Sequence, residues 1–214
     1  MTAYRPSPPV QHGAVQDLAA FRLSPGFRGR SKWVVQAWWL VQSLLFAPSP
    51  QVLFGWRRFL LRLFGARIGV KVLIRPSARV TYPWKLTIGD RAWIGDRVEL
   101  YTLGPIEIGH DAVVSQDCYL CTGTHDYRDP SFPMVTGPIR IGEESWLASQ
   151  VFVAPGVTVG AGAVVGVRSL VLADVPPMAK AVGQPAKVVG NRFDEPGGTG
   201  SVTGQVPGDL ASQA

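Results

Sequence analysis

An apolar residue recurs at every sixth position through much of residues 68–171, and this period constrains the fold more than any other feature. Fifteen positions keep the phase across two shifts of two residues and one longer break, and each of them is Ile, Leu or Val. Gly often follows directly, and a small or β-branched side chain usually stands four residues on. A fixed short period of this kind is typical of solenoid proteins. The fifteen residues are Ile68, Ile74, Val80, Ile88, Ile94, Leu100, Ile108, Val114, Leu120, Ile141, Leu147, Val153, Val159, Val165 and Val171.

Each hexapeptide is interpreted as a short strand followed by a tight corner, with its apolar residue pointing inward. Nine hexapeptides precede the break and six follow it, so three per coil predict about five coils of triangular cross-section. Parallel strands of neighbouring coils stack at about 4.8 Å, which gives a prism roughly 24 Å tall. The alternative, an ordinary β-sandwich, does not keep a six-residue phase over such a length. We therefore predict an all-β solenoid.

Composition divides the chain into four regions. Residues 1–30 form a polar extension with no apolar run that resembles a signal-peptide core. Residues 31–67 are rich in Trp, Leu and Phe with interspersed Arg, and the repeats fill residues 68–189. Residues 190–214 are rich in Gly, Ser and Thr, and we expect a disordered tail there. Two cysteines are too few for a disulfide scaffold.

The charge of the chain is unevenly distributed. A pI near 9.7 would ordinarily suggest a nucleic-acid partner. However, residues 1–67 hold nine Lys and Arg and one acid, a balance of +8, whereas residues 68–214 hold 12 cations and 14 acids, a balance of −2. Because the excess belongs to one N-terminal segment, we expect no nucleic-acid partner.

That basic segment contains two runs, residues 33–47 and 51–64, which we expect to be helical. The first run is mostly apolar and ends at Pro48, so it is shorter than the roughly 20 residues that a membrane span needs. Two interpretations stay open. The helices cap the open end of the solenoid, or they cap it and also contact an anionic membrane, because Trp and Leu beside Arg are typical of interfacial helices.

The longer break follows the ninth hexapeptide, where residues 126–138 form a polar, Pro-containing loop. Loops on rigid scaffolds often carry function, and His125 stands at the root of this one. Imidazole is the side chain best suited to take a proton from a weakly acidic hydroxyl near neutral pH. Asp126 could orient the imidazole or bind a substrate hydroxyl. Further candidates for lining a substrate site are Tyr101, Thr102, Asp117 and Tyr127.

Four segments resemble a known family: PWKLTIGDRAWIG (83–95), CTGTHDYRDPSF (121–132), GEESWLASQVFVAPGVTVGAGAVVG (142–166) and GQPAKVV (183–189). They are similar to the hexapeptide-repeat acyltransferases, and most of all to the polysaccharide-biosynthesis O-acetyltransferases of the colanic-acid type. The resemblance implies a left-handed parallel β-helix, a homotrimer with the site between subunits, acetyl-CoA as donor, and a sugar or lipid-linked glycan as acceptor. We expect a cytoplasmic enzyme, which the basic segment of residues 31–67 could place peripherally on the inner face of the cytoplasmic membrane.

The same resemblance implies roles for individual residues. His125 matches the catalytic base of the family. Leu172 and Ala173 stand where many relatives carry Thr-Lys, so a cation expected near the cofactor phosphates is missing there. The residues that match acetyl-CoA-binding positions are Trp146, Ser149, Val167, Arg168 and Lys187.

Other chemical readings of the sequence are weaker. A zinc-dependent relative with this fold needs three converging histidines, but only His110 and His125 lie in the repeats, so we expect no metal. Cys118 and Cys121 fall on repeat positions, and ordinary packing explains both of them. The alternative is that Cys121 acts as a nucleophile that carries the acyl group. The rival functions are a non-catalytic scaffold that docks partners at a membrane, and transfer of a longer acyl group.

Overall fold

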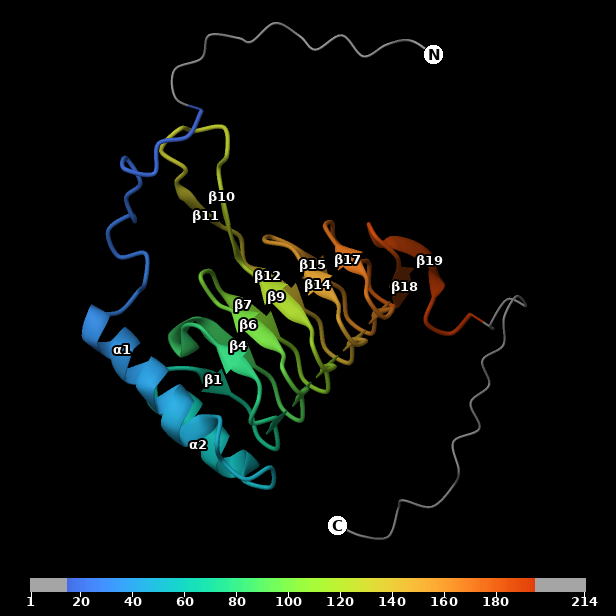
Figure 1. The fold of residues 1–214 in the computed structure, drawn as a ribbon. Helices are drawn as coiled ribbons and strands as arrows, with labels where there is room; N and C mark the ends of the chain where they lie inside the picture. The colour runs from blue at the N-terminus through green and yellow to red at the C-terminus, as the bar shows by residue number, and fades with distance from the viewer. Residues whose placement is uncertain (1–14, 195–214) are drawn as a thin grey trace, which may run out of the picture.

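Three parallel sheets form the three sides of a prism in the computed structural model, which describes residues 15–194 (Figure 1). The first sheet contains β1 (Arg67–Ile68), β4 (Leu86–Ile88), β7 (Ile106–Ile108), β12 (Ile139–Ile141) and β15 (Thr158–Val159). The second contains β2 (Leu73–Ile74), β5 (Trp93–Ile94), β8 (Val113–Val114), β13 (Trp146–Leu147), β16 (Val164–Val165), β18 (Ala179–Val182) and β19 (Lys187–Asn191). The third contains β3 (Arg79–Val80), β6 (Glu99–Tyr101), β9 (Tyr119–Cys121), β14 (Phe152–Val153) and β17 (Leu170–Val171).

The chain visits the three sheets in turn, so each circuit adds one coil. Five coils are complete, and a sixth begins where Val175 pairs in parallel with Val159 of the first sheet. It continues in β18, which pairs in parallel with β16. At the end of the solenoid β19 turns back antiparallel to β18. Most of the expected disordered tail, from residue 195 onward, lies outside the described residues, as do residues 1–14.

The predicted inward positions are confirmed, because none of the fifteen repeat residues exposes more than 7% of its surface. They stack in register along the sheets: Ile74 lies beside Ile94, for example, and Leu100 beside Leu120. The small residues four positions later are also buried wherever a coil continues. Thr124 is the exception, because the chain leaves the solenoid before that position and places Thr124 in an exposed strand.

One corner of the prism requires glycine. A Cβ atom on Gly109 would lie 2.4 Å from the backbone nitrogen of Glu143 in the next coil, closer than any real contact. Gly89 and Gly142 face the following coil in the same way. The recurring glycine after the inward residue is therefore explained by the close approach of stacked backbones rather than by a left-handed turn.

Helices cover the open end of the first coil (Figure 1). They are α1 (Lys32–Val41), a π-helical continuation (Gln42–Phe46) and α2 (Phe54–Leu63), and a short 3-10 turn (Pro83–Lys85) follows in the second coil. Trp38, Phe46 and Leu61 are buried against the end of the solenoid core. The capping role expected for residues 31–67 is thus present. Within residues 15–194 no helix is long and apolar enough to cross a bilayer.

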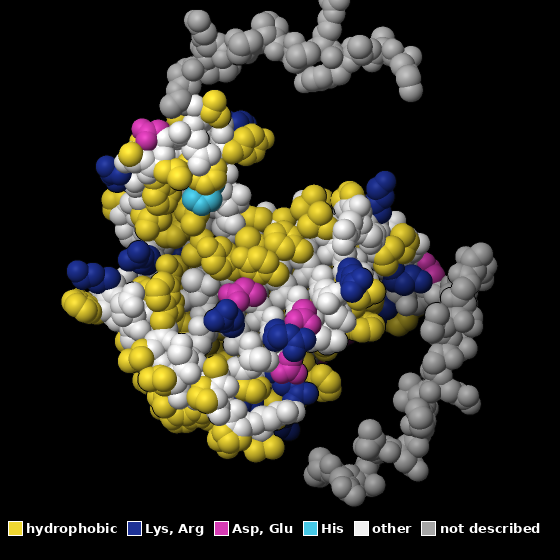
Figure 2. Space-filling view, in the orientation of Figure 1, with side chains coloured by type: hydrophobic (Ala, Val, Ile, Leu, Met, Phe, Trp, Pro, Cys, Tyr) yellow, Lys and Arg dark blue, Asp and Glu magenta, His cyan; other side chains and the backbone are white. Residues whose placement is uncertain are grey.

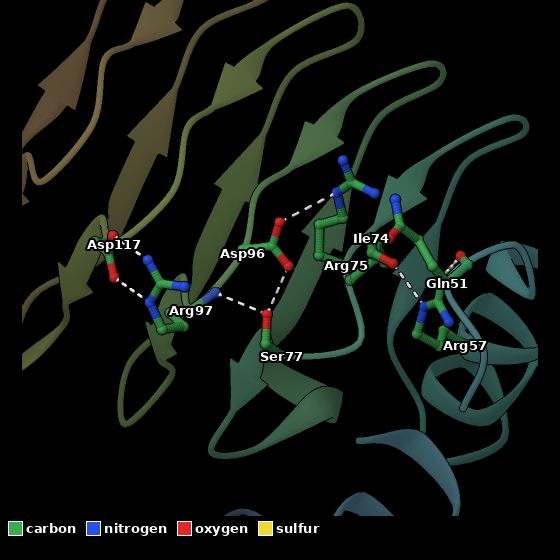
Figure 3. Close-up of polar contacts among 8 residues, drawn as sticks. All are labelled: Gln51, Arg57, Ile74, Arg75, Ser77, Asp96, Arg97 and Asp117. Atoms are coloured by element: carbon green, nitrogen blue, oxygen red, sulfur yellow. Dashed lines mark hydrogen bonds and ion pairs between the residues drawn. The ribbon is translucent and has the colours of Figure 1, made fainter. Parts of the chain in front are cut away.

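The arginines of α2 point toward the solenoid and satisfy its terminal carbonyl groups. The first coil donates its backbone N–H groups to the second coil, which leaves its own carbonyls without a coil beneath them. Arg57, which is fully buried, donates from Nε to the Ile74 carbonyl at 2.6 Å and from a terminal nitrogen to that of Gln51 at 2.5 Å (Figure 3). Arg58 binds the Val72 carbonyl, and Arg62 binds those of Ile68 and Gly69.

We expect Arg57→Met to destabilise the fold by roughly 3 kcal/mol, because the substitution leaves the buried carbonyl of Ile74 and the partly buried carbonyls of Pro50 and Gln51 without their donor. Arg58→Met is the matched control, since Arg58 makes a single hydrogen bond to the solenoid and is partly exposed. Its cost should be about 1 kcal/mol. Denaturant unfolding of both variants measures the difference, and equal losses would contradict the capping role given to Arg57.

Candidate active site

An arm projects from the solenoid where the sequence analysis expects a loop (Figure 1). It is a hairpin of β10 (Gly123–His125) and β11 (Met134–Thr136), antiparallel, with His125 opposite Met134. The arm leaves after β9 of the third sheet and returns to β12 of the first sheet, so it stands on the corner between them. The break in the repeat is therefore an ordered element rather than an irregular loop.

The root of the arm is fastened to the coil below it. Thr122 is fully buried, and its hydroxyl donates to the Tyr101 carbonyl at 2.5 Å while it accepts the Gly104 N–H at 2.7 Å. Leu103 packs against Gly123, where an added Cβ atom would lie 2.6 Å from a terminal methyl carbon of Leu103 and would force that side chain to move. These contacts fix the direction in which the arm, and the histidine at the end of β10, leaves the solenoid.

The geometry of His125 determines which ring nitrogen is free. Its Nδ1 lies 2.8 Å from the backbone carbonyl oxygen of Phe132, and a carbonyl can only accept, so Nδ1 carries the proton. The Phe132 ring stacks on the imidazole with centroids 4.1 Å apart and an interplanar angle of 9°. In a neutral imidazole this leaves Nε2 with a lone pair, oriented by a backbone contact and a stacked ring.

The N-terminal segment also reaches the histidine, a contact that no pattern in the sequence predicts. The Asp17 N–H donates to the Pro130 carbonyl at 2.7 Å, so this segment lies along the arm. The ring of Phe21 lies 5.9 Å from the His125 ring, centroid to centroid. Figure 2 shows a histidine (cyan) on the inner side of the arm, at the hollow between the arm and the solenoid body.

Asp126 contacts its own turn rather than the imidazole. Its Oδ1 accepts from the backbone N–H of Arg128 at 3.0 Å and from Arg128 Nε at 3.1 Å, and these bonds hold the pKa of the carboxyl below its ordinary value. Among the described residues no hydrogen bond joins Asp126 to His125. Tyr127, at the tip of the arm, is largely exposed.

Aromatic side chains line the outer face of the third sheet, next to the root of the arm. Tyr101 and Tyr119 meet edge to face with centroids 5.9 Å apart, and Tyr119 meets Phe152 in the same way at 5.4 Å. Figure 2 shows an apolar band on the solenoid below the hollow. Burial raises the pKa of Tyr101, with contributions from Cys121 and Tyr82, so its phenol stays protonated and can donate a hydrogen bond.

Two of the predicted substrate residues serve the solenoid instead. Thr102 is fully buried, and its hydroxyl bridges to the backbone of Tyr82 in the coil below. Asp117 lies on the corner between the second and third sheets, where it accepts from Arg97 at 2.6 and 2.7 Å (Figure 3). Tyr101 is therefore the predicted substrate residue that stands beside the arm root, whereas Thr102 and Asp117 contribute to stacking of the coils.

The residues predicted to bind acetyl-CoA gather on the later coils, on a corner different from that of the arm. Trp146 lies on the second sheet and donates from Nε1 to Ser115 at 2.9 Å. Ser149 and Arg168 lie in turns between the second and third sheets and are joined by a backbone hydrogen bond of 2.9 Å. Val167 is exposed beside Arg168, and Lys187 is exposed at the start of β19. The third sheet separates this group from His125.

The remaining titratable candidates have structural partners. His110 lies at a glycine-lined corner and its Nδ1 donates to Asp111 at 2.9 Å. Cys118 is buried and donates to the Ala148 carbonyl, and burial raises the pKa of its thiol to about 11. Cys121 is half-buried and donates to the Gly123 carbonyl. Over residues 15–194 no group of three or more His, Cys, Asp or Glu side chains is placed to hold a metal ion.

The two thiols should differ in reactivity. With a pKa of about 11, roughly one Cys118 thiol in a thousand is ionised at pH 8, and the side chain is also buried. We expect dithionitrobenzoate to label Cys121 first in the native protein, and Cys118 only after unfolding. Cys121→Ser should remove the fast phase and Cys118→Ala should keep it. Equal rates for both thiols would mean that the site around Cys118 opens readily.

Known proteins are similar to this chain in sequence and in fold. No protein-family model matches the chain. The chain is 56% identical over 180 residues to the Escherichia coli K12 protein named "putative colanic acid biosynthesis acetyltransferase WcaF", which covers 84% of this chain and 99% of the relative. Among solved structures, a hexapeptide-repeat containing acetyltransferase from Vibrio cholerae superposes with a TM-score of 0.70 at 26% identity, covering 76% of this chain and 93% of that one.

Two further solved structures of similar proteins contain acetyl-CoA or coenzyme A. The Vibrio cholerae protein was also solved in complex with acetyl-CoA, with a TM-score of 0.70, 25% identity, and coverage of 76% of this chain and 89% of that one. A galactoside acetyltransferase in complex with coenzyme A has a TM-score of 0.69 at 23% identity, covering 78% and 82% of the two chains, and shows the shared fold.

These similarities and the solenoid define the class of protein: it is a hexapeptide-repeat acetyltransferase, and thus an enzyme. Within that class the chain belongs to the family of the colanic acid biosynthesis acetyltransferases. The fold predicted from the sequence, a left-handed parallel β-helix with an N-terminal helical segment, is confirmed.

Proposed function

We propose that this enzyme moves an acetyl group from acetyl-CoA to a sugar hydroxyl of an exopolysaccharide or glycan precursor, with His125 as general base. Nε2 of His125 takes the proton as the hydroxyl oxygen attacks the thioester carbonyl. The tetrahedral intermediate then expels the CoA thiolate, which recovers the proton from the imidazolium. The products are an acetyl ester and CoA thiol. The polysaccharide acceptor is proposed because the relative's name assigns it to colanic acid biosynthesis.

One observation carries this proposal: the hydrogen bond from His125 Nδ1 to the Phe132 carbonyl. It assigns the free lone pair to Nε2, and the stacked Phe132 ring holds the imidazole plane. A base held in one tautomer and one orientation does not have to reorganise during the reaction. For Asp126 we propose a positioning role, since its contacts with Arg128 shape the turn of the arm rather than the imidazole itself.

The placement of the residues supports a site shared between subunits. In a single chain, His125 stands on the corner between the third and first sheets, whereas Trp146, Ser149 and Arg168 lie on or near the corner between the second and third. We propose a homotrimer in which the arm of one subunit faces the cofactor residues of its neighbour. The acceptor would then lie under the arm, beside Tyr101 and Tyr127. We further propose a cytoplasmic enzyme located at the inner face of the cytoplasmic membrane.

His125→Ala should lower kcat by about 10²–10⁴-fold, the usual contribution of a general base. Thiol release from acetyl-CoA in the presence of a glycan acceptor measures the rate. His110→Ala is the matched control, because His110 is a corner residue on another part of the solenoid, and its rate should stay near that of the wild type. A His125→Ala enzyme as fast as wild type on a good acceptor would disprove the base assignment.

A shared site also predicts complementation between inactive subunits. Coexpressed His125→Ala and Trp146→Ala chains should form mixed trimers that regain acetyl transfer. At some interfaces the intact His125 of one chain then faces the intact Trp146 of the other. Each variant expressed alone provides the baseline. If the mixture stays at that baseline although mass measurement shows mixed trimers, the site lies within one chain and the proposed arrangement is wrong.

A further inference from the structure

The outer surface of the capping helices is apolar, although the segment is rich in arginine. Trp33, Leu40 and Leu44 form one stripe along α1 and its π-helical continuation, and Trp56, Phe59 and Leu63 form a second stripe along α2. These six side chains, here called the apolar cap face, are between 38% and 73% exposed. Figure 2 shows the apolar side chains gathered over α1 and α2. A contiguous apolar surface of this kind usually marks an interaction site.

The two stripes belong to one rigid surface. Trp56 donates from its indole nitrogen to the Leu45 carbonyl at 3.0 Å, which ties α2 to the end of the π-helical turn. The Trp56 and Phe59 rings stack with centroids 5.7 Å apart. On the opposite side the arginines of α2 are bound to carbonyls of the first coil. The helices therefore have a fixed orientation, with arginines toward the solenoid and aromatic and leucine side chains toward the outside.

Cations collect at one edge of this face. Arg28, Arg30 and Lys32 line a cavity of about 240 Å³ at the start of α1, and the Lys32 ammonium lies 5.3 Å from the centre of the Trp33 ring. Residues 18–89 contain twelve Lys and Arg and no Asp or Glu. No carboxylate from this part of the chain is therefore available to neutralise that edge, and its charge complements an anionic surface.

We infer that the apolar cap face docks on an anionic lipid bilayer, with Trp, Phe and Leu entering the interface and the edge cations meeting lipid phosphates. Tryptophan and leucine beside basic residues are the usual composition of such surfaces. A second copy of the same face is a poorer partner, because residues 18–89 contain no Asp or Glu and such a copy offers the edge cations no carboxylate to pair with. The inference names the partner for the peripheral location proposed above, and it does not depend on the chemistry at His125.

Docking would also place the active site at a set position from the membrane. The segment from residue 15 to 31 leads from the cation edge to the arm, where Asp17 and Phe21 contact the hairpin that carries His125. Along the way the Trp84 indole donates to the Arg28 carbonyl, and Lys85 binds the Phe27 carbonyl. An enzyme held in this way presents its arm to acceptors carried on the same bilayer, which suits a lipid-linked glycan.

Flotation of the full chain with vesicles tests the inference. We expect the wild type to float with vesicles of phosphatidylcholine and phosphatidylglycerol, and much less with phosphatidylcholine alone. The triple variant Trp56→Ser, Phe59→Ser, Leu63→Ser should lose about tenfold or more of its vesicle binding, because three interfacial side chains are removed. The matched control is Val188→Ser, Val189→Ser, Phe193→Ser, which removes three similarly exposed apolar residues at the other end of the solenoid and should bind like wild type.

A second pair of variants separates apolar from electrostatic binding and guards against misfolding. Arg28→Gln, Arg30→Gln, Lys32→Gln should reduce binding to the anionic vesicles and leave the weak binding to phosphatidylcholine unchanged. If the α2 variant fails to fold in a thermal unfolding test, Trp33→Ser, Leu40→Ser, Leu44→Ser removes the other stripe and should lose binding in the same way.

Several results would overturn the inference. If the folded wild type floats with neither kind of vesicle, the apolar cap face does not dock on a bilayer. Serine variants that float like the wild type would place the membrane contact elsewhere. If the wild type does not float and the serine variants have a smaller mass by light scattering, the face is a contact between copies. Thiol release with a water-soluble acceptor is measured separately, so failure of membrane binding is distinguishable from failure of the proposed reaction.

Discussion

The interaction on which the rest of the structure depends is the capping of the first coil. A parallel solenoid ends in a row of backbone carbonyls and an open apolar core, and both need partners. Arg57, Arg58 and Arg62 donate to those carbonyls, and the Trp38 indole donates to that of Val80. The helices that carry these donors also bury the end of the core. At the other end, β19 folds back on β18.

The regular stack determines the position and direction of the irregular arm. Parallel coils fix the corner from which the hairpin leaves, and the buried hydroxyl of Thr122 fixes its direction. After the turn of the arm, the backbone carbonyl of Phe132 lies beside His125 and accepts a hydrogen bond from its imidazole. Among the contacts of residues 15–194, a backbone carbonyl of the local hairpin orients His125 and no carboxylate does, which separates this arrangement from the familiar Asp–His pair.

The sequence predicts the repeating part of this structure well because one period describes it. Every coil needs an apolar residue at its inward positions and a small residue at its crowded corner, so both can be recognised without a structure. The direction of the arginines on α2 could not be predicted, because an amphipathic pattern does not say which face meets the solenoid and which meets water. The contact between Phe21 and His125 could not be predicted for another reason. More than a hundred residues separate the two, and no repeat period links them. Asp126, adjacent to His125, turned out to face Arg128.

The direction of those arginines also changes the meaning of the chain's basic charge. An interfacial helix normally directs its cations toward lipid headgroups, whereas α2 directs Arg57, Arg58 and Arg62 to carbonyl oxygens of its own chain. The +8 balance of residues 1–67 therefore overstates the charge that a membrane would meet. What remains outside is an apolar surface with cations on one edge. Membrane attachment of such a protein rests mainly on burial of aromatic and aliphatic groups, with electrostatics selecting the lipid and the orientation.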